Sequence, residues 1–196
     1  DRYNGLMLEG GVSNKCEYSD LIDEVYLDIE DDVTDRMKNL ANELTKDKES
    51  NYDKAASIRD FFLSGEYVYS LELPVNREKG SYIDYFIFAG KEGYCVQYAT
   101  AMTLLCRSSG IPARYVEGYL VTEKDENGNY VVRESNGHAF VQVFIPGYGW
   151  KIFDPTPSSE GGEVDIIEEN NEKSGGSLSG LRVSFTSVSY THLTLP

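Results

Sequence analysis

The stretch from Gly90 to Arg114 reads GKEGYCVQYATAMTLLCRSSGIPAR and predicts one helix together with both of its ends. Gly110 stands where a C-terminal cap glycine belongs, and Pro112 prevents the helix from continuing. Side chains at helical spacing would form one buried face of this helix: Ala99, Met102, Leu105 and Cys106. The stretch therefore predicts a buried helix whose first turn carries Cys95.

Cys95 lies where a thiol ionises most easily. A helix N-terminus presents unpaired N–H groups and a partial positive charge of about half a unit, and both stabilise a thiolate. A nearby imidazolium adds to this effect and can lower the pKa of a thiol further. The alternative interpretation is a buried cysteine that packs as a small hydrophobic side chain. The partners of Cys95 decide between these two interpretations.

After Pro112 the sequence changes to runs that are typical of strands. Asn127-Gly128 supplies a hairpin turn signal between the first two runs. The four predicted strands are residues 113–122, 129–135, 138–145 and 149–154. Helices thus come first and an antiparallel sheet second, which predicts an α+β fold.

Two further helices are predicted upstream. Asp31–Leu44 carries one apolar stripe and begins with two aspartates, which suit the positive end of a helix. Ser50–Asp53 resembles a capping box and opens the second helix. The apolar face of this helix is formed by Ala55, Ile58 and Phe62. Residues 66–73 are predicted as a strand, and residues 84–90 as helical or extended.

His138 and Asp154 lie on two strands that the short loop Pro146–Gly149 joins into a hairpin. Taken singly, the histidine is typical of a structural residue, and the aspartate, which precedes Pro155, of a turn former. On one hairpin the carboxylate can hold the imidazole and favour its charged form, as in a cysteine-type triad. A symmetric loop pairs Asp154 with Val141, so we expect a bulge or a skewed loop to bring Asp154 to His138.

We expect four segments along the 196 residues. They are an irregular N-terminal segment at 1–25, a folded domain at 26–157, an acidic Gly/Ser-rich linker at 158–187 and a tail at 188–196. The tail, VSYTHLTLP, is similar to a sequencing-library adapter read in frame, so we expect it not to be native. It contains His192, which leaves His138 for any mechanism that needs an imidazole.

The composition excludes several classes of function. The chain carries 33 acidic and 18 basic residues, a net charge of −15, which disfavours nucleic acid and anionic membrane surfaces as partners. No apolar run is long enough to cross a bilayer, and no nucleotide-binding, EF-hand or zinc motif occurs. Cys95 and Cys106 would lie about 16 Å apart on one helix, too far for a disulfide, whereas a Cys16–Cys106 pair stays open. We expect no metal and no cofactor.

Three motifs carry a resemblance to a known family. They are Gly93–Leu120 with GYC at a helix start, Asn136–Phe144 with a His-Ala-aromatic strand, and Gly147–Pro157, which reads GYGWKIFDPTP. Together they resemble the bacterial transglutaminase-like superfamily, and the similarity covers residues 26–157. The resemblance implies a papain-like core, in which N-terminal helices and the helix of the nucleophile pack on an antiparallel sheet. Phe140 departs from the family pattern, because many relatives have Trp there.

The resemblance also implies the chemistry. It implies Cys95 as the nucleophile, His138 as general base and acid, and Asp154 as the group that orients the ring. The implied function is thiol-dependent acyl transfer at amide bonds of a protein or peptide, through a thioester, with crosslinking, deamidation or hydrolysis as the outcome. The alternative function is an inactive peptide-binding or scaffolding module on the same fold. Three aromatic residues could line the substrate cleft, with core packing as their alternative role: Tyr94, Tyr98 and Trp150.

The resemblance finally suggests a location. YDKA, at Tyr52–Ala55, is similar to the start of a helix that precedes the core in membrane-anchored relatives. We therefore expect an extracytoplasmic and monomeric domain, which the full-length protein tethers to the cell membrane through anchors outside this chain.

Overall fold

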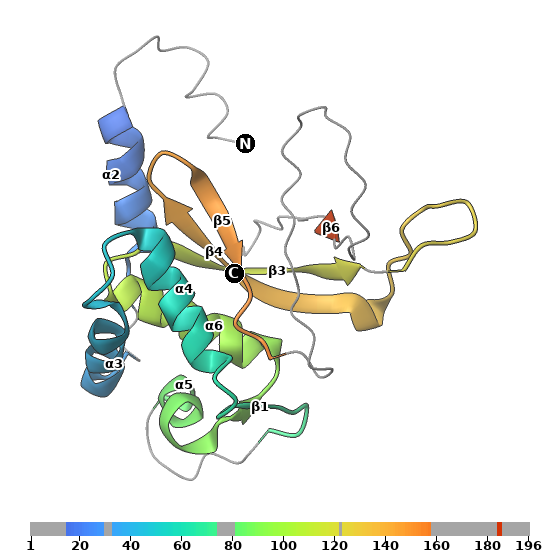
Figure 1. The fold of residues 1–196 in the computed structure, drawn as a ribbon, viewed down its shortest axis with the longest axis horizontal. Coiled ribbons are helices and arrows are strands. Elements are labelled where there is room, and N and C mark those ends of the chain that lie inside the picture. Colours follow the sequence, from blue (N-terminus) through green and yellow to red (C-terminus); the bar gives the residue numbers. More distant parts are fainter. Residues whose placement is uncertain (1–14, 30–32, 74–80, 122, 158–183, 186–196) are drawn as a thin grey trace, which may run out of the picture.

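A computed structural model describes residues 15–29, 33–73, 81–121, 123–157 and 184–185 of the chain. Most of the helical elements precede the main sheet in the chain (Figure 1). The helical elements are α2 (Lys15–Tyr26), α3 (Asp35–Thr45), α4 (Asn51–Phe62), α5 (Tyr82–Tyr85), the π-helical turn η1 (Phe86–Gly90), α6 (Cys95–Ser108) and the 3₁₀ turn η2 (Glu134–Asn136). The strands are β1 (Val68–Tyr69), β2 (Glu92–Gly93), β3 (Ala113–Val121), β4 (Gly137–Ile145), β5 (Gly149–Phe153) and β6 (Ser184–Phe185).

The main sheet has the strand order β5-β4-β3-β6, and each neighbouring pair in it is antiparallel. In the register, Ala113 of β3 lies opposite Val143 of β4, and Val141 of β4 lies opposite Phe153 of β5. β1 and β2 form a separate, parallel pair. The predicted arrangement, helices first and an antiparallel sheet second, is confirmed.

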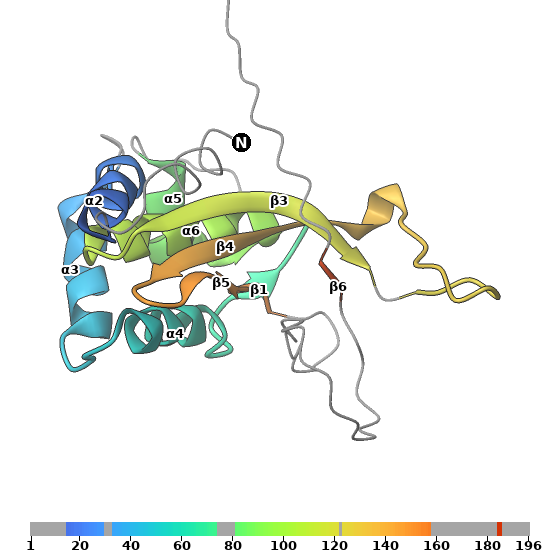
Figure 2. The same ribbon diagram turned by 90° about the horizontal axis from the view of Figure 1, so that it is seen from above.

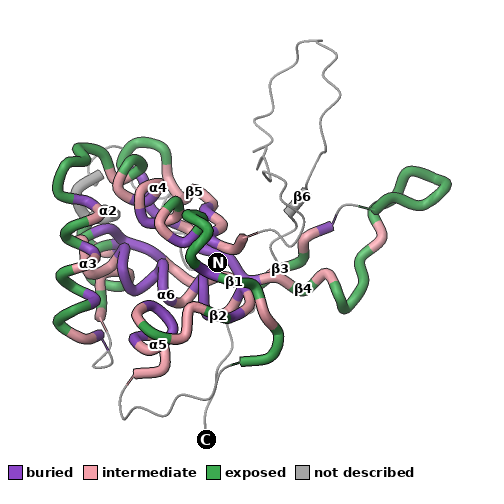
Figure 3. Tube along the Cα trace, turned by 60° about the horizontal axis from the view of Figure 1, so that its bottom comes forward, coloured by how far each residue is buried: buried purple, intermediate pink, exposed green. Residues whose placement is uncertain are grey.

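Helix α6 lies at the centre of the molecule. It packs against β4 and β3, and α3 and α4 pack against it (Figure 2). Figure 3 shows the buried core around α6, in contrast to the largely exposed loop between β3 and β4. The predicted buried face of α6 is buried in full: Ala99, Met102, Leu105 and Cys106. Burial of one large apolar side chain stabilises a fold by about 1.5–3 kcal/mol, so the packing of α6 makes a major contribution to stability.

A cluster of aromatic rings fixes the start of α6 in place. Phe62 of α4 stacks on Phe86 of η1 with ring centroids 6.1 Å apart. Tyr98 of α6 meets both rings edge-on, at 6.0 Å and 5.0 Å respectively. Tyr67 joins the cluster, and its hydroxyl donates to the carbonyl of Ile87 at 2.8 Å. Aromatic pairs of this kind add about 0.5–1.5 kcal/mol each beyond burial, so α4, η1 and α6 are held together as one unit.

The predicted helix ends agree with the structure in most places. The Ser50 hydroxyl accepts from the N–H of Asp53 at 3.1 Å, which confirms the cap of α4. Gly110 follows α6 with φ +71°, a conformation that glycine adopts without strain. The start of α3 differs, because Thr34 caps it by accepting from the N–H of Met37. The two aspartates at 31 and 32, predicted to open this helix, lie outside the described residues.

Two predicted strands are wrong in extent. The strand expected at 66–73 is limited to Val68–Tyr69, because its partner β2 offers two residues for pairing. The run at 129–135 forms no continuous strand. Its apolar side chains Tyr130 and Val132 are exposed, so burial does not stabilise an extended conformation there. The ambiguous run at 84–90 is helical, as α5 and η1.

A helix stands where the sequence analysis predicted an irregular segment at 1–25. Residues 15–26 form α2, and Ile22 is buried with 2% of its surface exposed. One turn later the Tyr26 ring meets Trp150 edge-on, with centroids 4.8 Å apart. This i, i+4 pair supplies the apolar face that the analysis overlooked. Residues 1–14 lie outside the described part of the chain.

Within the predicted linker at 158–187, the structure describes two residues. Ser184 and Phe185 form β6 and pair with Val121 and Leu120 of β3, so this short piece is a strand. The remainder of the linker and the tail at 188–196, with His192, lie outside the described residues. Within the described ranges, each helix is too short or too polar to cross a bilayer.

Candidate active site

Cys95 is the first residue of α6, as predicted. The N–H of Tyr94 donates to the side-chain carbonyl of Gln97 at 3.1 Å, which fixes the first turn. A side chain at Gly93 would be crowded, because a Cβ there would lie 3.0 Å from Cβ of Gln97 and 3.1 Å from the ring of Phe86. In the GYC motif the glycine thus lets the backbone pass close to Gln97 and Phe86, and the cysteine places its thiol at the helix start. Of the surface of Cys95, 8% is exposed.

His138 and Asp154 meet beside this helix start. Nε2 of His138 and Oδ2 of Asp154 are 2.6 Å apart, a short hydrogen bond between two largely buried side chains. Oδ1 of Asp154 accepts from the N–H of Thr156 at 3.0 Å. Both carboxylate oxygens are therefore bonded, which fixes the orientation of the carboxylate toward the ring.

The hairpin achieves this contact without a bulge, through a displaced loop, which was the other arrangement that we expected. The β4–β5 ladder runs regularly from Ile145–Gly149 to Val141–Phe153. The next pair along this register would join Phe140 and Asp154, so His138 is the diagonal neighbour of Asp154. Diagonal neighbours on one face have Cα atoms about 7–8 Å apart, within reach of a histidine and an aspartate. The turn is centred on Gly147 instead of between Gly147 and Tyr148, which shifts the register by one residue. The expected skewed loop is therefore present, and the ladder needs no bulge.

His138 also acts on the side chain of Cys95, since hydrogen bonding between the two groups lowers the pKa of the thiol and raises the pKa of the imidazole. Because Nε2 is engaged by Asp154, Nδ1 is the ring nitrogen that is left to face the thiol. The structure thus brings together the three residues that the sequence analysis selected, in the order thiol, imidazole, carboxylate.

The surroundings of the pair favour its charged form. Burial by itself raises the pKa of the Cys95 thiol, but hydrogen bonds from His138 and from the N–H of Ala139 bring the pKa below its usual value. The N–H of Val96, in the first turn of α6, contributes in the same direction. Burial lowers the pKa of His138, but the bonds to Asp154 and Cys95 outweigh it and raise the pKa to about 9. A thiolate beside an imidazolium is the reactive state of such a cysteine.

Two tyrosines that the sequence analysis did not single out flank the thiol. Burial raises the pKa of Tyr69, and the charges of Cys95 and Tyr94 raise it further. Burial also raises the pKa of Tyr115, followed by its bond to Glu117 and by the charges of Glu117, Cys95 and Tyr94. Because such interactions weaken with distance, both phenols lie within electrostatic range of the sulfur. The strand register could have located Tyr115, since it lies opposite Val141 of the strand that carries His138.

The three predicted cleft aromatics lie in different environments. Tyr94 is half-buried beside the thiol, as its influence on Tyr69 and Tyr115 indicates. Tyr98 is fully buried in the aromatic cluster of the core. Trp150 lies at the far end of β5 against Phe144, with the guanidinium of Arg114 4.1 Å from its ring centroid. The structure therefore brings Tyr94 to the thiol but brings neither Tyr98 nor Trp150 there.

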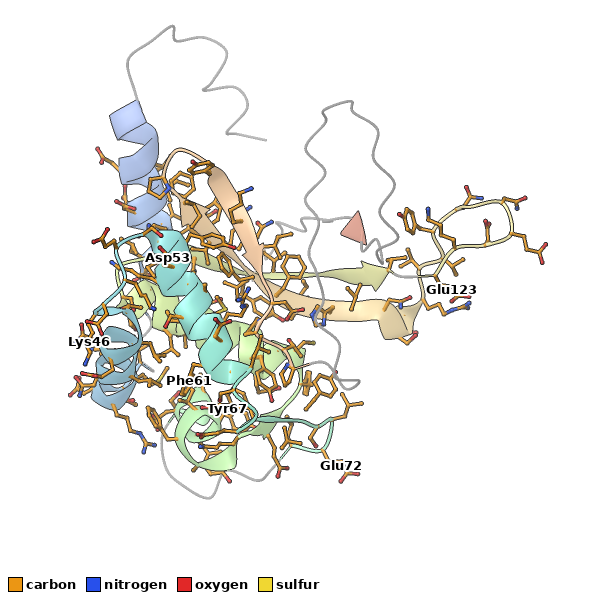
Figure 4. The ribbon with its side chains drawn as sticks, viewed as in Figure 1. Lys46, Asp53, Phe61, Tyr67, Glu72 and Glu123 are labelled. Carbon is orange, nitrogen blue, oxygen red and sulfur yellow. The ribbon has the colours of Figure 1, made fainter. Side chains whose placement is uncertain are left out.

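A surface hollow of about 490 Å³ lies elsewhere, between the end of α3 and the start of α4. Its lining is mostly acidic and includes Asp53, labelled at the start of α4 in Figure 4. None of the residues around Cys95 contributes to this hollow. Across the described residues, no three His, Cys, Asp or Glu side chains come together as a group that could hold a metal ion.

Comparison with protein families and known proteins assigns the chain to a family. Residues 38–155 match the family described as the transglutaminase-like superfamily. The chain is 38% identical over 151 residues to the uncharacterized protein YebA of Bacillus subtilis, and this match covers 73% of the chain and 20% of that protein. It is 35% identical over 122 residues to a protein-glutamine gamma-glutamyltransferase of Pseudomonas aeruginosa, covering 62% of the chain and 18% of the relative. The chain thus spans about a fifth of the length of these relatives.

A solved structure agrees with the fold. The periplasmic domain of TgpA from Pseudomonas aeruginosa is 31% identical to the chain, with a TM-score of 0.62 over 69% of the chain and 47% of that domain. The same domain bound to ethylmercury gives a TM-score of 0.61. The predicted α+β fold, with the helix of Cys95 packed on an antiparallel sheet, is confirmed.

Proposed function

The chain belongs to the transglutaminase-like superfamily, and from this premise we propose that it catalyses thiol-dependent acyl transfer at amide bonds of proteins or peptides. One arrangement carries the proposal, namely Cys95 at the start of α6 with His138 lowering the pKa of its thiol and Asp154 hydrogen-bonded to the ring of His138. The alternative, an inactive peptide-binding module, would not need a thiol with a lowered pKa or a carboxylate bonded through both oxygens.

Acylation would begin from the thiolate–imidazolium pair. The sulfur of Cys95 attacks the carbonyl carbon of the amide, the C–S bond forms, and negative charge develops on the carbonyl oxygen. The backbone N–H of Cys95, at the positive end of α6, is a candidate donor to that oxygen. As the C–N bond breaks, His138 gives its proton to the leaving nitrogen. The result is a thioester on Cys95 and a neutral imidazole.

Deacylation would run the same steps with a new nucleophile. Neutral His138 takes a proton from the attacking amine or water, the new bond to carbon forms, and the C–S bond breaks. The thiolate leaves and the thiolate–imidazolium pair is restored. Asp154 keeps the ring oriented and stabilises its charged form in both half-reactions.

The relative named protein-glutamine gamma-glutamyltransferase supports glutamine as the acyl donor. With a lysine amine as acceptor the product is an isopeptide crosslink, and with water it is a deamidated glutamine. We propose residues 26–157 as the catalytic domain. The periplasmic origin of the similar TgpA domain supports an extracytoplasmic location. Tethering to the membrane in the full-length protein is a separate part of the proposal, and it rests on the resemblance of Tyr52–Ala55 to membrane-anchored relatives.

The test is to mix the chain with a glutamine dipeptide, N-carbobenzoxy-glutaminyl-glycine, and a primary amine, and to follow products by mass spectrometry. We expect amide exchange or deamidation by the wild type, and for Cys95→Ala a loss of about 10⁴-fold or more, down to background. Cys106→Ala is the matched control, because its thiol is fully buried away from the site. Equal turnover by the wild type and Cys95→Ala would contradict the proposal.

A further inference from the structure

The side chain of Glu117 lies on the face of β3 that is turned toward α6. β3 and β4 pair antiparallel, with Tyr115 opposite Val141 and Glu117 opposite Ala139. Ala139 and Val141 are buried against the helices, so their neighbours Tyr115 and Glu117 share that face. The N–H of Ala139 is itself a donor to the Cys95 sulfur. Since paired Cα atoms are about 4.5–5.5 Å apart, Glu117 lies one strand away from Ala139, whose N–H acts on the Cys95 thiol.

Tyr115 holds the carboxylate of Glu117 in this place. Its hydroxyl donates to Oε1 of Glu117 at 2.7 Å, and its ring packs against the hydrophobic core. The neighbouring charges of Cys95 and Tyr94 act on this phenol, which places it at the edge of the site. A charge-assisted bond from a packed ring limits the positions that the carboxylate can take.

Glu117 lacks the cationic partner that some other carboxylates of the described residues have. Several acidic side chains are neutralised by a cation, as in the pairs Glu66–Lys91 and Glu123–Arg133. Within the described part of the chain, Glu117 has Tyr115 as its hydrogen-bond partner and forms no ion pair. Its side chain is exposed, so a cation arriving from solvent can reach the carboxylate.

From these observations we infer that Glu117, held by Tyr115, is a specificity-determining residue that binds the ammonium group of a primary-amine acyl acceptor. This inference rests on the proposed function, because it concerns the second half-reaction at the same thiol. The ammonium binds at Glu117, releases one proton to solvent and becomes a free amine. Its nitrogen attacks the thioester, the C–N bond forms, the C–S bond breaks, and its second proton passes to neutral His138. The products are an amide and the thiolate–imidazolium pair.

The experiment loads the thiol with an acyl group from p-nitrophenyl acetate, so that recognition of a donor peptide plays no part. The acyl-enzyme is then offered pentylamine, which is protonated near neutral pH, or methoxyamine, which is not. The measured quantity is the ratio of kcat/KM for pentylamine to kcat/KM for methoxyamine. We expect Glu117→Gln to lower this ratio about five- to tenfold and Tyr115→Phe to lower it about two- to threefold.

Glu123→Gln is the matched control, because Glu123 lies on the arm between β3 and β4, away from the helices (Figure 4). This control makes the same charge change and should leave the ratio unaltered. An unaltered ratio in Glu117→Gln, or an equal fall in Glu123→Gln, would overturn the inference while the proposed function stands. Absence of any acyl-enzyme in the wild type, judged by intact mass, would instead remove the proposed function and the inference with it.

Discussion

Two cysteines on one helix show what makes a thiol reactive. Cys95 opens α6, and Cys106 lies in its last turn. They differ little in exposure, at 8% and 0%, yet the pKa of Cys95 is lowered whereas that of Cys106 is raised to about 12. Burial raises the pKa in both cases, so burial cannot explain why the pKa of Cys95 is lowered.

The difference lies in the donors that each sulfur meets. Cys95 is bonded by His138 and by the N–H groups of Ala139 and Val96, all of which stabilise the anion. Cys106 is surrounded by the core, and burial is the cause of its shift. It also lies near the negative end of the helix dipole, which disfavours a thiolate. The same helix therefore supplies one site for a nucleophile and one for a small hydrophobic side chain.

The largest change in the reactivity of Cys95 is expected when the imidazole of His138 is removed. We expect His138→Ala to lower acyl transfer by about 10³–10⁴-fold, because both the ion pair and the proton carrier are lost. Alkylation of Cys95 by iodoacetamide at neutral pH should slow by about tenfold or more, as the thiolate becomes a minor species. Liquid chromatography with peptide mass mapping measures both effects.

Asn136→Ala is a suitable control for that variant, because Asn136 lies in the adjoining turn η2 and bonds to the N–H of Arg133 rather than to the ring. If His138→Ala kept more than about a tenth of the wild-type rate, the ring would not be the base that the proposal requires.

How much of this site the sequence could predict depends on the range of each interaction. Cys95 at a helix start follows from local signals, since Gly110, Pro112 and the apolar periodicity mark the helix. The pairing of His138 with Asp154 was predicted as a contact, but the turn at Gly147 set the register. A shift of one residue in a ladder changes every partner, and the sequence does not determine it.

The residues that were missed depend on tertiary contacts. Glu117 and Tyr115 acquire a role because β3 pairs with β4 and α6 covers that face of both strands. Trp150 was expected either to line the cleft or to pack in the core. Its ring packs against Tyr26 of α2, a helix that was not predicted. Such contacts link distant parts of the chain and leave no periodic pattern.

The dependence of alkylation on pH should differ between Cys95 and Cys106, because their pKa values shift in opposite directions. As pH rises through the lowered pKa of Cys95, its thiolate fraction grows, and alkylation should reach its plateau below the range of an ordinary cysteine. Above about 9 His138 loses its proton, so acyl transfer should fall as the acid for the leaving group disappears. The expected profile of acyl transfer is therefore bell-shaped, with its alkaline limb near pH 9.

The pH series is measured as the rate of iodoacetamide alkylation, residue by residue, beside the rate of acyl transfer. Cys106 should stay unmodified throughout, since its thiol is both inaccessible and un-ionised. In His138→Ala the alkylation midpoint of Cys95 should move to higher pH by at least about one unit. A midpoint that is equal in both proteins would show that the ring does not stabilise the thiolate.

The smallest expected effect concerns stability, and it compares a hydroxyl at the two positions. Cys106→Ser places a polar group in an apolar site, where the i−4 carbonyl of Met102 offers partial compensation. We expect a loss of about 1–2 kcal/mol in the free energy of unfolding. Cys95→Ser places the same group beside the N–H groups of Val96 and Ala139, so a loss within about 0.5 kcal/mol is expected.

Urea titrations followed by circular dichroism give both free energies of unfolding, and Cys106→Ala separates the lost sulfur from the buried hydroxyl. This measurement tests the donors of Cys95 in the absence of any substrate, so it does not depend on the reaction that the protein catalyses. If serine at position 95 cost as much as serine at position 106, the first turn of α6 would not supply usable donors. The two ends of the helix would then be alike, and the lowered pKa of Cys95 would lose its structural cause.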